Sequence, residues 1–232
     1  MPARRVLVTG SAGAFAAEFR SFARDLYDLV LMDKVPTPGA PKALVADLAD
    51  LPALQEAAAG CDAILHLGAA AWADSDFMTQ VLPNNIVGTY NVFEAARLCG
   101  VKKVVFSSTV QVEAWQEGKL LTTDRPPINP NYYAASKIFG ENLGSLYSRR
   151  HGLSVICLRF GWIVTERDLP RLRSTTRGLR IAVTIRDLNE IVRRALDVEG
   201  VPYAILPAYS KNAAQIRDLS PLKETLGYEP QD

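Results

Sequence analysis

Cysteine and histidine are scarce in this chain of 232 residues, which has three of the former and two of the latter. Cys61, Cys99 and Cys157 stand far apart among apolar residues, which predicts buried free thiols in a reducing compartment, the cytoplasm. His66 and His151 have no partners at metal-ligand spacing, so we expect no metal site. No apolar run reaches the roughly 18 residues that a membrane helix needs, and the one after the basic N-terminus is too short for a signal peptide.

A strong excess of charge of one sign is also missing. The 26 lysines and arginines nearly balance 25 aspartates and glutamates, and no basic stretch interleaves with aromatic residues. This balance argues against nucleic acid as a partner. Hydrophobic residues make up 48% of the chain, and its length suits one α/β domain with a small appendage and a substantial core.

Short apolar runs alternate with helical segments along most of the chain. Strands are predicted at 4–9, 29–33, 43–46, 63–67, 103–107 and 154–159. Helices are predicted at 14–26, 51–59, 81–98 and 131–150. This alternation predicts a doubly wound, Rossmann-type parallel sheet over residues 1–160, with helices on both faces. Residues 161–232 are predicted to form a small C-terminal substrate lobe integrated with it, including a helix at 184–196 entered from a loop, a strand at 203–206 and a helix at 220–226.

A glycine-rich turn follows the first predicted strand. Gly10 permits the tight turn, Gly13 lets the backbone approach a pyrophosphate, and the small Ala16 lets the helix pack on the sheet. The start of the helix, at Ala12 and Ala14, would offer unpaired N–H groups and a partial positive charge to phosphates. The turn therefore predicts a bound dinucleotide.

Asp33 ends the second predicted strand, about 20 residues after the turn, where a carboxylate would accept hydrogen bonds from the ribose hydroxyls. The same carboxylate would repel a 2′-phosphate, so NAD is favoured over NADP, although the adjacent Lys34 leaves some tolerance of NADP open. Asp47 and Leu48 are candidates for contact with the adenine. A plain surface turn is the alternative there.

Tyr133 and Lys137 stand four residues apart on a predicted helix and therefore share one face. An ammonium group beside a phenol lowers the pKa of the tyrosine towards working pH. Tyr133 could then take a proton from a substrate hydroxyl while a hydride passes to the nicotinamide. An ordinary exposed pair is the alternative. The neighbouring Tyr132 has Ser136 at the same spacing, which cannot play the part of the lysine.

These motifs together resemble the extended branch of the short-chain dehydrogenase/reductase family, which includes sugar-nucleotide epimerases, dehydratases and uronate dehydrogenases. The segments that carry the resemblance are Thr9–Ala16, His66–Ala69, Asn84–Asn91, Ser107–Thr109, Tyr133–Lys137, Thr184–Leu188 and Leu226–Pro230. The resemblance implies that Lys137 also holds the nicotinamide ribose. It implies that Thr109 hydrogen-bonds the reacting oxygen, with Ser108 as the alternative if the register slips by one.

Further cofactor contacts are implied by the same resemblance. They come from Leu67, Gly68, Ala69, Asn85, Ser107 and Phe160. A packing amide is the alternative for Asn85, and a packed, hydrogen-bonded imidazole is the interpretation we favour for His66.

Uronate dehydrogenases are the subgroup that the chain resembles most, but the substrate side departs from their pattern. Ala71 replaces an expected serine, and Val110-Gln111 replaces an asparagine–histidine pair. An arginine for a substrate carboxylate is expected among Arg171, Arg173, Arg177 and Arg180, with Arg177 as our candidate and a solvated basic loop as the alternative. A pocket lined by Ala71, Trp72, Val110 and Trp162 would be less polar than a uronate site.

The sequence thus predicts an NAD-dependent oxidoreductase that acts on a hydroxyl of a small sugar or sugar-acid-like substrate. An epimerase or dehydratase that recycles a tightly bound NAD is the first alternative, and a non-catalytic NAD-binding protein is the second. By the same resemblance, the helices at 81–98 and 131–150 are expected to pair two subunits in a homodimer.

Overall fold

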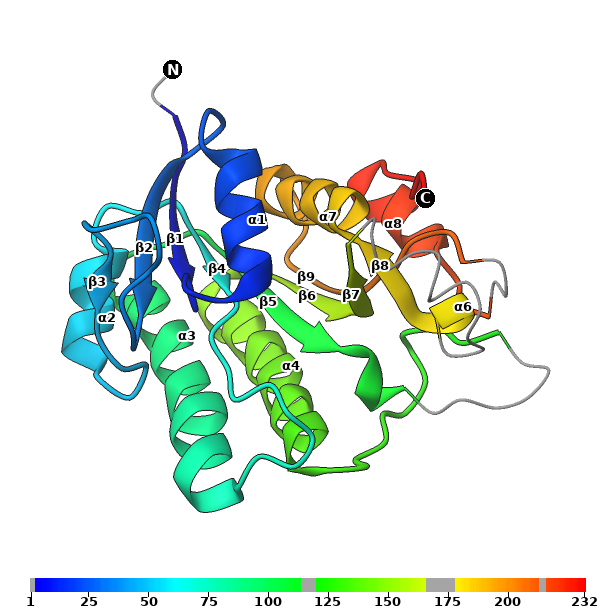
Figure 1. Ribbon diagram of the computed structural model, residues 1–232, viewed down its shortest axis with the longest axis horizontal. Helices are drawn as coiled ribbons and strands as arrows, with labels where there is room; N and C mark the ends of the chain where they lie inside the picture. The colour runs from blue at the N-terminus through cyan, green and yellow to red at the C-terminus, as the bar shows by residue number, and fades with distance from the viewer. Residues whose placement is uncertain (1–2, 114–119, 166–177, 213–215) are drawn as a thin grey trace.

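The computed structural model describes residues 3–113, 120–165, 178–212 and 216–232. A parallel sheet of seven strands, in the order β3-β2-β1-β4-β5-β6-β9, forms its centre (Figure 1). The strands are β1 (Arg5–Thr9), β2 (Asp28–Asp33), β3 (Leu44–Val45), β4 (Ala63–His66), β5 (Lys103–Thr109), β6 (Ser154–Phe160) and β9 (Tyr203–Ala208). The chain runs outwards from β1 to β3 and then crosses back to β4, which confirms the predicted doubly wound arrangement.

Two helical layers enclose the sheet (Figure 1). One contains α1 (Ala14–Ala23), α7 (Ile185–Asp197) and α8 (Ser220–Leu226), and the other α2 (Leu51–Ala58), α3 (Gly88–Leu98) and α4 (Tyr132–His151). Successive strand residues point to opposite layers, so Val6 and Val8 pack with α1 and α7, whereas Leu7 packs with α2 and α3. Because both faces are covered, the strands are apolar along their length. Within the described residues, no helix is long and apolar enough to cross a membrane.

The helix predicted at 81–98 begins earlier and has two parts. Its first part is a π-helix, η1 (Phe77–Val87), which continues into α3. Asp76 caps η1 by accepting the Thr79 N–H at 2.8 Å. Pro83 lies inside η1, and its carbonyl accepts the N–H of Gly88 five residues later. The wider π turn therefore accommodates a proline that would break a regular α-helix.

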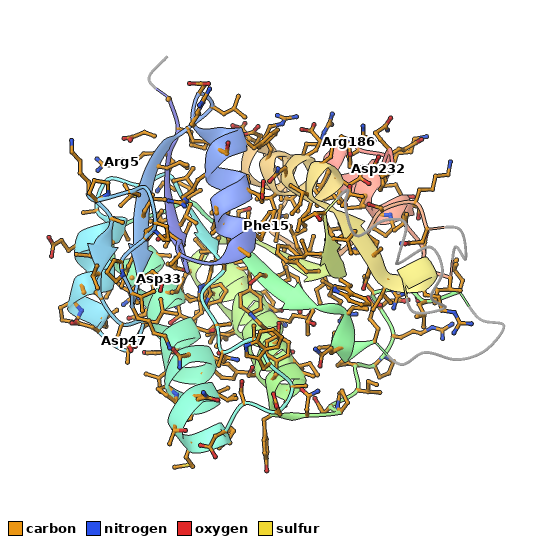
Figure 2. All side chains as sticks on the ribbon, in the orientation of Figure 1. Arg5, Phe15, Asp33, Asp47, Arg186 and Asp232 are labelled. Carbon is orange, nitrogen blue, oxygen red and sulfur yellow. The ribbon has the colours of Figure 1, made fainter. Side chains whose placement is uncertain are left out.

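The chain after residue 160 contributes to two structures. β7 (Trp162–Val164) and β8 (Ala182–Thr184) form a separate parallel pair, with α6 (Gly178–Ile181) before β8, while β9 joins the main sheet. α7 follows β8 directly, which corrects the predicted entry from a loop. Thr184 caps α7 by accepting the Asp187 N–H at 3.1 Å. Beside this end of α7, Arg186 pairs with Asp232 (Figure 2).

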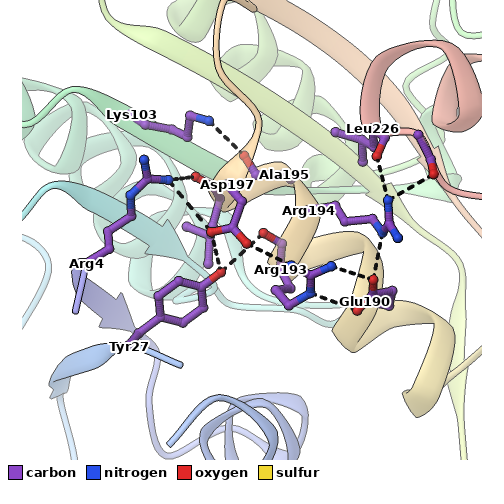
Figure 3. Close-up of polar contacts among 11 residues, drawn as sticks. Arg4, Tyr27, Lys103, Glu190, Arg193, Arg194, Ala195, Asp197 and Leu226 are labelled. Atoms are coloured by element: carbon purple, nitrogen blue, oxygen red, sulfur yellow. Dashed lines mark hydrogen bonds and ion pairs between the residues drawn. The ribbon is translucent and has the colours of Figure 1, made fainter. Parts of the chain in front are cut away.

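The other end of α7 is held by side chains at the amino ends of two strands (Figure 3). Lys103 Nζ donates to the carbonyls of Ala195, at 3.1 Å, and Val198. Arg4 donates to the carbonyl of Leu196. These cations bind carbonyls that have no partner within the helix, and they face the negative end of its dipole. They thereby fix α7 to the starts of β1 and β5.

Candidate active site

Two adjoining cavities open at the carboxyl ends of the central strands. The larger is about 700 Å³ and the smaller about 220 Å³. They share wall residues Gly10, Gly13, Leu67, Ala69 and Ala71, so they form one continuous groove. The groove crosses the point where the strand order reverses, which is where doubly wound sheets bind their ligands.

The glycine turn lies in the middle of this groove. Gly10 has a φ of +72°, and a Cβ there would lie 2.5 Å from the backbone nitrogen of Gly68, so glycine is required on both counts. α1 starts directly after Gly13 without a side-chain cap, and its first two residues, Ala14 and Phe15, line the larger cavity. The first N–H groups of α1 are thus left for an anionic ligand, as a pyrophosphate requires.

Asp33 marks one end of the groove. Its Oδ2 accepts the N–H of Ala12 at 3.0 Å and its Oδ1 accepts that of Val35 at 3.2 Å, which fixes the carboxylate at the wall of the smaller cavity. Lys34 and Leu48 line the same cavity. A fixed carboxylate next to an apolar wall fits the ribose and adenine of NAD.

Three residues predicted to bind the cofactor make internal contacts and line neither cavity: Ala12, whose N–H donates to Asp33 and is not left for a phosphate, together with Asp47 and Asn85. Asp47 accepts the N–H of Ala49 at 2.8 Å and is not among the residues that line either cavity. Asn85 donates to the carbonyl of Ala70 at 3.0 Å and to Ser136 Oγ at 2.9 Å, and it accepts the Ala70 N–H at 2.7 Å. Asn85 therefore connects the loop after β4 to α4, which agrees with the alternative role of a packing amide.

Tyr133 and Lys137 lie at the other end of the groove. Asn131 caps α4 by accepting the Ala134 N–H at 2.8 Å, so the helix begins where both side chains can reach the larger cavity. Lys137 Nζ is 5.7 Å from the centre of the Tyr133 ring. The predicted pair is therefore together on one wall.

The end of β5 supplies the hydroxyls beside this pair. Ser107 and Thr109 line the same cavity, and Lys137 Nζ donates to Ser107 Oγ at 3.5 Å. The structure thus brings all three predicted catalytic residues, Tyr133, Lys137 and Thr109, to one place. Phe160, at the end of β6, closes the wall and meets the Phe15 ring edge-on, with ring centres 5.6 Å apart.

Burial sets the protonation of the pair. It lowers the pKa of Lys137 to about 7 and raises the pKa of Tyr133, against which a hydrogen bond with Thr109 acts. The sequence predicted that Lys137 would lower the pKa of Tyr133. In the structure, burial is the largest cause of both pKa shifts. Lys137 does not lower the pKa of Tyr133 as predicted, because a lysine that readily loses its own proton exerts little electric field on a phenol at this distance.

Ser108 lines the cavity, but its hydroxyl points to a buried ion pair. It donates to Glu141 Oε1 at 2.6 Å, and Glu141 accepts from Arg159 Nε at 2.9 Å and Nη2 at 3.0 Å. Both partners of the pair are almost fully buried. No sequence motif singled out this pair, although Glu141 stands four residues after Lys137 and so shares its helix face.

The remaining walls form the candidate substrate end. They are contributed by Ala71, Trp72, Ala73, Val110, Gln111, Gly161, Trp162, Ile163 and Ile181. Of the predicted substrate contacts, Ala71, Ser108, Thr109 and Val110 line this cavity. Arg171, Arg173 and Arg177 lie outside the described residues. Arg180 lines a separate, smaller pocket with Tyr209 and Arg217. Among the described residues, no three metal-ligating side chains form a cluster.

A dinucleotide groove that ends at a tyrosine, a lysine and a strand-end hydroxyl is the arrangement of a short-chain dehydrogenase/reductase. A model of the "NAD dependent epimerase/dehydratase family" matches residues 6–190, and the chain belongs to this family. Membership confirms the predicted resemblance and, with it, an NAD-dependent enzyme of the extended short-chain type.

Relatives match along the whole chain. Uronate dehydrogenase of Pseudomonas syringae pv. tomato is 30% identical over all of this chain and 83% of its own length. L-arabinose 1-dehydrogenase (NAD(P)(+)) of Haloferax volcanii is 30% identical over 98% of this chain and 96% of its own. The solved structure of a uronate dehydrogenase mutant from Agrobacterium tumefaciens, complexed with NAD, is 29% identical, covers 99% and 85% of the two chains, and has a TM-score of 0.87.

Proposed function

We propose that the protein is a dehydrogenase that moves a hydride from a hydroxyl-bearing carbon of a small sugar or sugar acid to NAD. The observation that carries this proposal is the convergence of Tyr133, Lys137 and Thr109 at the end of the groove opposite Asp33. The full-length similarity to sugar and sugar-acid dehydrogenases supports the substrate class.

Each residue at that end has a distinct task. NAD, when bound, supplies the acceptor for the hydride. Tyr133 Oη takes the proton of the substrate hydroxyl as the hydride leaves the same carbon, and Thr109 orients the substrate oxygen. Lys137 is held near Ser107, and whenever the lysine is protonated its charge stabilises the phenolate form of Tyr133.

The variant Tyr133→Phe tests this assignment. We expect kcat to fall by about 10²- to 10⁴-fold, the usual contribution of a general acid or base, while the Kd for NAD hardly changes. NADH formation is followed by absorbance over a panel of sugars and sugar acids, and NAD binding by calorimetry. The control is Tyr132→Phe, which keeps the ring that contacts Phe77 and should keep full activity.

Two outcomes would contradict the proposal. Normal turnover by Tyr133→Phe would exclude its acid–base role. A wild-type protein that carries NAD and converts sugars without net formation of NADH would be an epimerase or dehydratase instead.

We also propose that residues 161–232, the expected C-terminal lobe, share substrate selection with the walls that Ala71, Trp72 and Val110 contribute. Within this segment, β9 is a strand of the main sheet and α7 packs on one face of that sheet. The segment is therefore set apart by its function and not as a separate structural domain. Trp162 and Ile163 of β7 and Ile181 of α6 support this proposal, because they line the larger cavity.

We further infer a cytoplasmic homodimer that pairs through η1, α3 and α4. α4 packs against both of the others, and these helices carry large apolar side chains that are 39–66% exposed: Met78, Val87, Tyr90, Tyr132 and Leu146. A second copy of the same surface would cover them. The three free cysteines support a reducing compartment.

A further inference from the structure

We propose that the substrate is an uncharged sugar, whose apolar C–H face packs on Trp72 at the mouth of the larger cavity. This inference rests on the proposed dehydrogenase function and specifies its substrate class. It favours a hexose or pentose over the hexuronates that the names of several relatives suggest.

Two tryptophans from distant parts of the chain line this cavity. Trp72 follows β4 and is 77% exposed, and Trp162 belongs to β7 and is 45% exposed, yet both line the cavity. Two partly exposed indoles on the wall of one cavity form an apolar surface, and a ligand that covers this surface gains hydrophobic stabilisation. An indole gives a rigid apolar surface at a low cost in side-chain entropy, which suits the flat C–H face of a sugar ring.

The described residues of the rest of the wall offer little to a carboxylate. Ala71, Val110, Ile163 and Ile181 are apolar, and Gln111 is a neutral amide whose oxygen already accepts from Asn131 at 2.8 Å. Among the described residues of this wall, Lys137 is the only cation, and it is buried beside Tyr133 and Ser107. Carboxylates are normally held by a paired, accessible cation.

The loop that carries Trp72 is also acidic. Asp74 and Asp76 follow Trp72 within four residues and are both exposed. Hydrogen bonds from Thr79 lower the pKa of Asp76 below the ordinary value for an aspartate, which is itself ionised at neutral pH. Neither aspartate lines the cavity, but both follow Trp72 closely in the chain, so a hexuronate that packs on Trp72 is repelled more than a neutral sugar, and the difference weakens as salt is added.

Binding to the NAD-loaded Tyr133→Phe variant measures this preference without requiring turnover. Calorimetry would compare a hexose with the hexuronate of the same configuration, in the gluco, galacto and manno series. We expect at least one hexose to bind fivefold or more tighter than its hexuronate. Adding Trp72→Ala should weaken hexose binding about two- to tenfold, and Trp72→Phe should restore most of it. Leu26→Ala, which also removes an exposed apolar side chain but lies away from the cavity, is the matched control and should change nothing.

Other results would overturn the inference. Hexuronates that bind as tightly as hexoses, or tighter, in every series would exclude a neutral substrate. Hexose binding that Trp72→Ala leaves unchanged would exclude the packing role of the indole. The dehydrogenase proposal is judged separately, by whether the wild-type enzyme reduces NAD with any sugar that binds.

Discussion

The carboxylate of Asp33 shows how one residue can select a cofactor. It is fixed by two backbone N–H groups, of Ala12 and Val35, at the ribose end of the groove. We expect Asp33→Asn, which can still accept from Ala12, to raise KM for NAD about tenfold and to raise the NADP/NAD ratio of kcat/KM at least tenfold, because the charge that binds ribose and repels phosphate is gone. Steady-state kinetics with both cofactors test this. Asp47→Ala is the control, and an unchanged ratio in Asp33→Asn would contradict the assigned role.

His66 is the residue whose burial should be visible in the pH dependence of stability. It lies between Thr9, at 2.7 Å, and Thr89, at 3.2 Å, and burial lowers its pKa from 6.5 to about 3. In the unfolded chain the His66 imidazole binds a proton below about pH 6.5, whereas in the folded chain it does so only below about pH 3. Stability is lost as the pH falls through this window, by about 2 kcal/mol from this group between pH 7 and pH 5.

Urea unfolding at pH 7 and pH 5 measures that loss. We expect His66→Gln to be less stable than the wild type at pH 7 but to lose about 2 kcal/mol less on acidification. The change in the free energy of unfolding with pH therefore distinguishes the titration of His66 from the loss of its packing contacts. Equal slopes in the two proteins would show that His66 is not kept neutral by the fold.

At the scale of the element, α7 depends on residues that are distant in the sequence. Lys103 and Arg4 bind its last carbonyls from the starts of β5 and β1. We expect Lys103→Met to lower the free energy of unfolding by about 2–3 kcal/mol, because buried carbonyls lose a charged donor. Chemical denaturation measures this loss. The exposed neighbour provides the control, Lys102→Met, which should change stability by less than about 0.5 kcal/mol. Equal stability of the two variants would contradict the capping role.

At the scale of the whole molecule, the exposed apolar side chains of η1, α3 and α4 predict self-association. We expect sedimentation velocity to give the mass of a dimer, and Leu146→Asp, on α4, to shift it towards the monomer because a charge would be buried in the interface. Glu18→Lys, an exposed change on α1 in the opposite layer, is the control and should remain dimeric. A monomeric wild-type protein would contradict the proposed pairing.

Much of this fold could be predicted from local patterns. Alternating strands and helices, the turn at Gly10 and the Tyr133/Lys137 spacing each lie within a few residues of sequence, so periodicity and spacing reveal them. The Glu141–Arg159 pair and the contacts of Lys103 could not be predicted in this way. They join separate elements, and their partners are set by how helices pack on the sheet. Likewise β7 and β8 have only three residues each, and pairing with each other defines them.

The two ends of the strands have different roles, because the carboxyl ends hold the candidate active site and the amino ends hold α7. The phosphate turn, Asp33 and the Tyr133/Lys137 pair all stand at the carboxyl edge, whereas Lys103 and Arg4 hold α7 at the amino edge. Substitutions at the amino edge therefore change how readily the protein unfolds without moving a reacting group. Stabilising substitutions at the amino edge would raise the free energy of unfolding. That added stability would let the enzyme tolerate destabilising substitutions at Trp72 and Trp162 that change its specificity.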